Sequence, residues 1–192
     1  MIFQDVYRNK RVFITGHTGF KGSWLSLWLK ELGAKVKGYS LEPSTKENLF
    51  SIIEIDSEIE SIIGDIKNEE KLSKEIEKFK PDIIFHLAAQ PLVRLSYNEP
   101  RYTYETNVMG TINLYEAARK CDSVKAIVTI TTDKCYENKE WVYGYRECDS
   151  MGGYDPYSSS KACVELITNC YRNSFFTNLG IGIVTAREGH VI

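Results

Sequence analysis

The chain has 192 residues, of which 43% are hydrophobic and 26% are charged, and its formal net charge is −2 at pH 7. This length and composition suit one domain with one good core. The small net charge gives no reason to expect nucleic acid or an anionic membrane surface as a partner. The first residues, MIFQDVYRNKR, lack the apolar run of a signal peptide, and no stretch approaches the length of a membrane span. We therefore expect a soluble cytoplasmic protein.

The cysteines are odd in number and irregularly spaced. The chain has five of them, none in a C-x-x-C pair: Cys121, Cys135, Cys148, Cys163 and Cys170. This pattern favours neither a disulfide framework nor a zinc site. We expect reduced, mostly structural thiols and no bound metal.

The first element spans residues 11–33 and reads as a strand, a turn and a helix. An apolar strand over 12–14 runs into three glycines spaced G-x-x-G-x-x-G, at Gly16, Gly19 and Gly22. The apolar residues that follow are dense enough to predict a buried helix: Trp24, Leu25, Leu27, Trp28, Leu29 and Leu32. Glycine permits a close approach, so the N–H groups that begin this helix are expected to face a pyrophosphate. A plain turn also explains a lone glycine triplet, but the strand before it and the helix after it favour the phosphate site.

The rest of the chain alternates strands and helices. Strands are expected over 35–41, 58–63, 82–87, 124–130 and 181–185, and helices over 68–80, 98–120 and 155–175, with a short helix at about 48–53. The helix over 68–80 is amphipathic, with Leu72, Ile76 and Phe79 on one face, and Pro81 stops it. This β-α-β-α order predicts an α/β fold with a doubly wound parallel sheet.

Polar and small residues recur where the expected strands end. Asp65 follows the third strand, His86 closes the fourth, and Ala88 and Ala89 leave room for a flat ligand. Because ligands of a doubly wound sheet lie beyond the carboxyl ends of its strands, these residues are expected to line one edge. Taken alone, each has a plainer reading: Asp65 starts a turn, and His86 is a strand-end histidine with satisfied hydrogen bonds.

The sharpest pattern is Tyr157-Ser-Ser-Ser-Lys161 at the start of a helix. Residues four apart share a helix face, so the lysine ammonium is expected near the phenol, where a cation favours the phenolate. Tyr157 would then be a general base toward a substrate hydroxyl, and Thr132 could hydrogen-bond the same oxygen. The plainer reading is a tyrosine and a lysine on a solvated helix.

A polar residue also interrupts an apolar helix pattern. Asn107 precedes Val108, Met109 and Ile112. If buried, its amide needs a partner, which a water or a backbone carbonyl near the site could supply. The alternative is an exposed helix residue.

Five motifs in this order resemble the extended short-chain dehydrogenase/reductase superfamily over almost the whole chain. They are TGHTGFKG at 15–22, GDI at 64–66, HLAAQ at 86–90, TNVMGT at 106–111, and TDK at 132–134 followed by Tyr157 and Lys161. Within the superfamily, the runs GHTGFKGSWL, HLAAQPLVRLSY and TTDKCYEN most resemble the CDP-glucose 4,6-dehydratases.

The resemblance implies an NAD-binding Rossmann domain over residues 1–192, with the C-terminal nucleotide-sugar domain of such enzymes largely absent from this chain. It implies the following NAD-binding residues: Gly16, Thr18, Gly19, Phe20, Lys21, Gly22, Ser40, Asp65, Ile66, Leu87, Ala88, Ala89, Gln90, Asn107, Tyr157 and Lys161. The second strand ends without the acidic residue usual at the ribose position. The preference for NAD therefore depends on the resemblance and on the absence of an arginine there. His190 stands where the family generally has an asparagine that contacts the nucleotide sugar.

For catalysis, the resemblance implies an internal redox cycle that converts CDP-glucose to CDP-4-keto-6-deoxyglucose, a lyase step of deoxysugar biosynthesis. Tyr157, with Lys161 and Thr132, would take the proton of the sugar 4-hydroxyl while hydride passes from C4 to NAD and later returns to C6. Asp133 would protonate the departing 6-hydroxyl. Lys134 occupies the position of a glutamate base in related dehydratases. An ammonium cannot accept a proton, so Lys134 is deprotonated for that step or acts electrostatically.

The resemblance also implies a homodimer through the helices over 98–120 and 155–175. These helices carry more large apolar residues than one sheet-facing stripe requires, including Tyr102, Met109, Tyr115, Val164, Ile167 and Tyr171. Two other functions stay open. A related nucleotide-sugar epimerase or reductase would use Tyr157 and Lys161 without elimination, and a non-catalytic module would only bind NAD.

Overall fold

The computed structural model describes residues 2–189, which form a six-stranded sheet in the order β3-β2-β1-β4-β5-β6. Every pair of neighbouring strands is parallel. The strands are β1 Arg11–Thr15, β2 Lys35–Ser40, β3 Glu60–Ile63, β4 Ile83–His86, β5 Ala126–Thr132 and β6 Gly182–Glu188. The predicted doubly wound parallel sheet is confirmed, and its strand order reverses between β1 and β4, where such sheets bind ligands.

Helices connect the strands. They are α1 Phe20–Glu31, α2 Leu49–Ile52, α3 Glu69–Phe79, α4 Val93–Asn98, α5 Pro100–Tyr104, α6 Gly110–Arg119 and α7 Pro156–Tyr171. The short turns are η1 Ile2–Asp5, η2 Ile55–Ser57 and η4 Asp133–Cys135, and wider π turns are η3 Glu105–Met109 and η5 Arg172–Phe176. The short helix predicted at about 48–53 is present, and Asn48 caps it by accepting a hydrogen bond from the N–H of Ser51.

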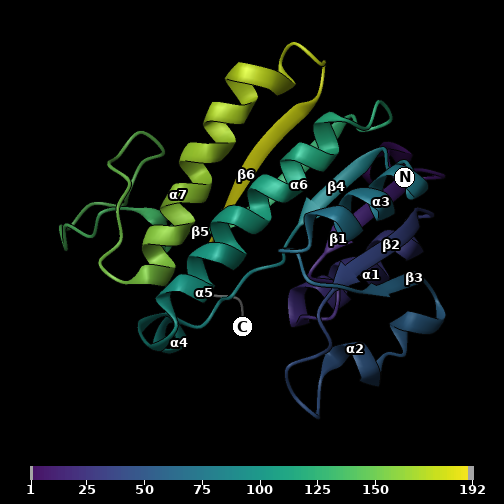
Figure 1. The fold of residues 1–192 in the computed structure, drawn as a ribbon, viewed down its shortest axis with the longest axis horizontal. Coiled ribbons are helices and arrows are strands. Elements are labelled where there is room, and N and C mark those ends of the chain that lie inside the picture. The colour runs from purple at the N-terminus through teal and green to yellow at the C-terminus, as the bar shows by residue number, and fades with distance from the viewer. Residues whose placement is uncertain (1, 190–192) are drawn as a thin grey trace.

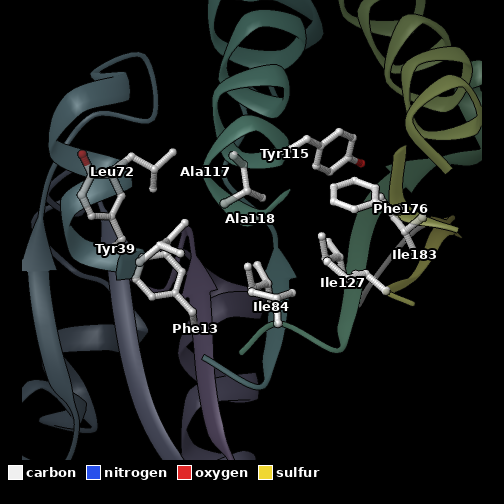
Figure 2. Packing of buried hydrophobic residues seen from close by; sticks show 14 of the residues in the cluster. Phe13, Tyr39, Leu72, Ile84, Tyr115, Ala117, Ala118, Ile127, Phe176 and Ile183 are labelled. Atoms are coloured by element: carbon white, nitrogen blue, oxygen red, sulfur yellow. The ribbon is translucent and has the colours of Figure 1, made fainter. Parts of the chain in front are cut away.

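The two faces of the sheet bury two apolar clusters. On one face, Phe13, Tyr39, Ile84 and Ile127 point toward α3, α6 and the C-terminal turn at Phe176 (Figure 2). Figure 1 shows α6 and α7 side by side over this face. On the other face, a smaller cluster with Val12, Ile14 and Val36 packs under α1 through Leu29. The predicted apolar face of α3 is confirmed, because Leu72 and Ile76 are fully buried and Phe79 packs against the cluster.

The prediction that the apolar residues of α1 are buried is wrong for both tryptophans. Trp24 and Trp28 are each 52% exposed. The buried residues of this helix are Gly22, Ser23, Ser26 and Leu29. Small side chains let the helix lie close to the β1 loop, and the serine hydroxyls donate to helix carbonyls, as Ser26 does to Gly22 at 2.7 Å. Close backbone approach, rather than apolar density, therefore decides which side of α1 faces the sheet.

The single helix predicted over 98–120 is also wrong at its start. The preceding α4 was not expected, and it ends at Asn98. Glu99 leaves the helical conformation, with φ −128° and ψ 59°, and Pro100 begins the next helix. A residue before proline is driven out of the α region, which explains the break. The new helix then widens into the π turn η3 before continuing as α6.

Within residues 2–189, no helix is both long and apolar enough to cross a membrane. All five cysteines are free, and Cys135 is buried. No cluster of potential metal ligands was found among the same described residues.

Candidate active site

The glycine loop joins β1 to α1. Gly16 has a left-handed φ of 79°, and a Cβ on it would lie 2.7 Å from the backbone N of Ala88. A Cβ on Gly22 would lie 2.0 Å from the carbonyl oxygen of Gly16, whereas a Cβ on Gly19 would meet the same oxygen only at 3.4 Å. Gly16 and Gly22 are therefore required by the fold, and Gly19 is not.

The N-terminus of α1 is open to an anion. Gly19 is the N-cap, and no side chain in the described part of the chain caps the first turn. The first N–H groups of a helix lack intrahelical partners and carry the positive end of the helix dipole. This arrangement suits a pyrophosphate.

A cleft of about 930 Å³ extends from this loop along the carboxyl ends of the strands. Its lining includes, of the residues predicted to bind NAD, Gly16, Thr18, Gly19, Phe20, Lys21, Gly22, Ser40, Asp65, Ile66, Leu87, Ala88, Ala89, Gln90, Tyr157 and Lys161. Asn107 lies outside the lining, as do Thr132, Asp133 and Lys134. The structure thus brings most of the predicted cofactor residues to one cleft, with Tyr157 and Lys161 among them.

Thr18 ties the glycine loop to the end of β2. Its hydroxyl donates to the carbonyl of Leu41 at 2.8 Å and lies 2.9 Å from the Ser40 hydroxyl. Because the Thr18 proton is already used, Ser40 must be the donor in the second contact. Ser40 therefore keeps acceptor capacity toward the cleft. Just after the end of β3, the carboxylate of Asp65 accepts a hydrogen bond from the N–H of Lys67 at 2.8 Å, so Asp65 does start a turn.

Asn107 is buried, and its partners are inside the protein. Its side-chain oxygen accepts from the N–H of Gln90 at 2.7 Å. Its amide nitrogen donates to the carbonyl of Gln90 at 3.1 Å and to the hydroxyl of Ser160 at 2.9 Å. The structure therefore supplies the backbone carbonyl partner that the sequence left open, and the amide holds the loop after β4 against α7.

His86 is buried between two hydroxyls. Its Nδ1 lies 2.7 Å from the hydroxyl of Thr15, and its Nε2 lies 2.9 Å from that of Thr111. Burial, helped by the charge of Lys161, lowers the pKa of His86 to about 3. The plainer reading, a satisfied strand-end histidine, describes it correctly.

Tyr157 and Lys161 lie in the first turns of α7. Asp155 caps this helix by accepting from the N–H of Ser158 at 2.9 Å, as its Asp-Pro start predicts. The ammonium of Lys161 donates to the carbonyl of Ile130 at 3.0 Å, and burial lowers its pKa to about 8. Burial raises the pKa of Tyr157, and a hydrogen bond with Thr132 opposes that rise. The direction is opposite to that expected from the Tyr-Lys spacing, because burial raises the pKa of Tyr157 and the nearby carboxylates of Asp133, Asp155 and Glu188 act in the same direction.

The remaining predicted catalytic residues follow β5. The hydroxyl of Thr132 donates to the carboxylate of Asp133 at 3.0 Å. Asp133 and Lys134 are exposed in the turn η4, and the N–H of Lys134 lies 3.4 Å from the Thr132 hydroxyl. His190 lies outside the described residues.

Two features of the site escaped prediction. Residues 42–52, which the sequence did not assign to the site, form a wall of the cleft through Pro43, Leu49 and Ile52. The second feature is an ion pair between Lys21 on α1 and Glu188 at the end of β6. Glu188 pairs with Thr132 in the sheet register, so the ion pair lies near the end of β5 that carries the predicted catalytic residues. The polar composition of residues 42–52 does not indicate a ligand site. Lys21 and Glu188 are 167 residues apart, so no local sequence pattern predicts their pairing.

Comparison with known proteins decides the family. A model of the family described as GDP-mannose 4,6 dehydratase matches residues 13–191. The chain belongs to this family. The CDP-glucose 4,6-dehydratase of Salmonella typhimurium is 56% identical to this chain over 197 residues, which cover 100% of this chain and 55% of that protein. The UDP-glucose 4-epimerase of Mycolicibacterium smegmatis is 34% identical, over 86% of this chain and 52% of that protein. The chain thus spans about half the length of these curated relatives.

Solved structures similar to this family member have the same fold. The UDP-glucose 4-epimerase of Thermotoga maritima, determined with UDP-glucose, has a TM-score of 0.81 and 25% identity over 92% of this chain and 54% of that one. The UDP-glucose 4-epimerase of Thermus thermophilus, determined with NAD, has a TM-score of 0.79 and 27% identity over the same shares. The Rossmann architecture inferred from the sequence is confirmed.

Proposed function

We propose that this chain is part of an NAD-dependent nucleotide-sugar 4,6-dehydratase, a lyase that converts CDP-glucose to CDP-4-keto-6-deoxyglucose. One observation carries the proposal. The cleft built on the glycine loop reaches Tyr157 and Lys161, and the Thr132–Asp133–Lys134 turn follows the strand beside them. The similarity to a CDP-glucose 4,6-dehydratase supports this choice of substrate.

The residues of the cleft fit NAD. The uncapped N-terminus of α1 suits the pyrophosphate, and Gly19 at its N-cap adds no side chain there. Ser40 and Asp65, at the ends of β2 and β3, offer acceptors for ribose hydroxyls, and the cleft volume of about 930 Å³ is sufficient for a dinucleotide. When bound, NAD would take a hydride from C4 of the sugar and return it to C6, so the reaction needs no external oxidant.

The chain's own residues would manage the protons. Tyr157 takes the proton of the sugar 4-hydroxyl, and Thr132, its hydrogen-bond partner, orients the phenol and the sugar oxygen. Because burial raises the pKa of Tyr157, the phenol needs a nearby positive charge to act as a base. Lys161, buried close by with its ammonium on the carbonyl of Ile130, is the residue placed to supply it.

Asp133 and Lys134 would carry the elimination. The carboxyl group of Asp133 protonates the departing 6-hydroxyl, and its exposure lets it exchange its proton with solvent. Lys134 removes the C5 proton if it is deprotonated, or stabilises the enolate if it is charged. The pH dependence of C5 deuterium exchange distinguishes these two roles, because only the first requires loss of the lysine proton.

The test is turnover by the complete protein. Incubation with CDP-glucose and NAD should release a 4-keto-6-deoxy sugar nucleotide, which mass spectrometry identifies as the loss of one water. A product of unchanged mass with inverted C4 would instead identify an epimerase, the second candidate, which the 34% identical relative and the solved epimerases favour. NAD binding without turnover of any sugar nucleotide would support a non-catalytic module.

We also propose a homodimer through the segment Pro100–Arg119 and α7. Tyr115 and Val164 do not contribute to it, because both are buried within this chain. Met109 is 49% exposed and Leu166 is 61% exposed, so each helix still carries an apolar residue to cover. Light scattering that finds only monomer at micromolar concentration would contradict this assembly. The cytoplasmic location stays a prediction.

A further inference from the structure

A buried chain of hydrogen bonds runs beneath the cleft from the loop after β4 to the π turn η3. The N–H of Ala88 lies 3.2 Å from the Thr15 hydroxyl, which lies 2.7 Å from Nδ1 of His86. On the other side of the ring, Nε2 lies 2.9 Å from the Thr111 hydroxyl, which lies 2.6 Å from the carbonyl of Asn107. His86, Thr15 and Thr111 are each at most 3% exposed, so water does not substitute for these partners.

The chemistry of its two ends fixes the direction of every bond. The carbonyl of Asn107 can only accept, so Thr111 donates to it and has no proton left for His86. His86 must therefore donate from Nε2, which leaves Nδ1 as an acceptor. Thr15 then donates to Nδ1 and accepts from the N–H of Ala88. Only the neutral Nε2–H tautomer of His86 satisfies this chain, and its lowered pKa keeps it neutral at pH 7.

The π turn η3 is also hydrogen-bonded to two segments that line the cleft. Asn107, whose carbonyl ends the chain, grips both backbone groups of Gln90 and the hydroxyl of Ser160. Ser160 in turn donates to the carbonyl of Tyr157 at 2.7 Å. The loop that lines the cleft and the first turn of α7 thus share one buried network. None of its central members, His86, Thr111 and Asn107, belongs to the cleft lining.

We infer that His86 is a positioning residue. Held as the Nε2–H tautomer between Thr15 and Thr111, His86 fixes the loop after β4, which carries Gln90, relative to the first turn of α7, which carries Tyr157. This is the arrangement that binds a dinucleotide. This inference rests on the proposed NAD site. His86, a buried histidine below the cleft, would thus set the affinity for the cofactor without contacting it.

Thr111→Val tests the role, because it removes one hydroxyl and keeps the shape. In the complete protein, calorimetry should find NAD bound at least about tenfold more weakly, since a buried donor on His86 loses its acceptor. Thr129→Val is the matched control. Thr129 is equally buried at 1% exposure and lies beside His86 in the sheet, but its hydroxyl lies 2.7 Å from that of Tyr115, and neither residue lines the cleft. It should bind NAD like the unchanged protein, and Thr111→Ser should restore the affinity.

Nitrogen-15 NMR of the histidine rings gives a second, independent readout in the unchanged protein. His86 should show the Nε2–H tautomer at pH 7, and an Nδ1–H tautomer would overturn the inference. Equal loss of NAD affinity in Thr111→Val and Thr129→Val would also overturn it, because any buried hydroxyl would then serve. A complete protein that binds no NAD would instead refute the proposed function, and this role with it, whatever the tautomer.

Discussion

The cleft and the residues beneath it, here called the cofactor side, are built differently from the turn η4 and the loop that follows it. On the cofactor side, Thr18, Asn107 and His86 are buried and hydrogen-bonded to other parts of the chain. On the other side, Asp133 and Lys134 are exposed, and they begin a long loop that Figure 1 shows projecting past α7. The proposed cofactor site is therefore preorganised in this part of the protein. The proposed elimination depends on groups whose position is set by a few anchors.

The main anchor of the loop is a buried ion pair. Glu165 on α7 accepts hydrogen bonds from Thr185 and Arg187, each at 2.9 Å, and from Thr131. Although burial favours the neutral form, these hydrogen bonds hold the pKa of Glu165 below its usual value. Arg187 also donates to the hydroxyl of Tyr136, at 2.5 Å, and lies over its ring. Arg187 thus attaches the loop after Asp133 to β6 and, through Glu165, to α7.

The largest effect is expected at the meeting point of the two sides. Tyr157→Phe removes the proton acceptor and keeps the ring, so turnover should fall by about 10⁴-fold, or about 5 kcal/mol. No NADH absorbance should appear in a single turnover with CDP-glucose. NADH formation at an unchanged rate would show that another group takes the 4-hydroxyl proton.

Arg187→Met should detach the loop. It leaves the carboxylate of Glu165 buried, at 6% side-chain exposure, without its charged partner. Breaking such a pair costs about 3–5 kcal/mol of unfolding free energy, measurable by urea denaturation. Arg146→Met is the control, because Arg146 pairs with Asp149 on the same loop but its side chain is 75% exposed. The unfolding free energy of that variant should be close to that of the unchanged protein. Equal losses of unfolding free energy in both variants would show that Arg187 is not the anchor.

Two glycines separate folding from binding on the cofactor side. Gly22→Val places its Cβ about where the carbonyl of Gly16 lies, so α1 must move, and unfolding free energy should fall by about 3 kcal/mol or more. Gly19→Val meets no such clash. It should unfold like the unchanged protein and lose NAD affinity, because its side chain occupies the pyrophosphate position. A folded Gly19→Val protein with unchanged affinity in calorimetry would refute the glycine-loop assignment.

The structural features of the cofactor side that the sequence predicted correctly have local signals. Glycine spacing, the cap at Asp155 and the apolar face of α3 each depend on neighbours within a turn or two. The pairs that complete the site do not. Lys21 meets Glu188 and Arg187 meets Glu165 only after the sheet has formed, and many other charges could have served as partners. The α1 tryptophans failed for a related reason: apolar density predicts burial, but packing against the glycine loop admits only small residues.

Asp133→Asn sharpens the contrast within the catalytic residues. It leaves Tyr157, Lys161 and Thr132 in place and removes the acid for the departing 6-hydroxyl. Oxidation at C4 should therefore proceed while elimination slows by about 10²-fold. NADH absorbance should accumulate in a single turnover, unlike in Tyr157→Phe. If neither variant forms NADH, Asp133 positions the substrate and its assignment as the acid must be withdrawn.

The smallest expected effect is on the pH dependence of the unfolding free energy, and it comes from the buried amino group of Lys161. Its folded pKa of about 8 lies below the usual 10.5, so between these values the unfolded chain holds a proton that the folded protein has released. Stability contributed by this residue must then rise with pH from about 8 to 10.5, by about 2.5 kcal/mol. Lys161→Met removes the titrating group. The difference in unfolding free energy between the unchanged protein and this variant should therefore shift in favour of the former as the pH rises, because all other groups titrate in both. A difference that stays constant over that range would mean that Lys161 keeps its proton in the folded state, and that its ammonium stands ready beside Tyr157 even in alkaline solution.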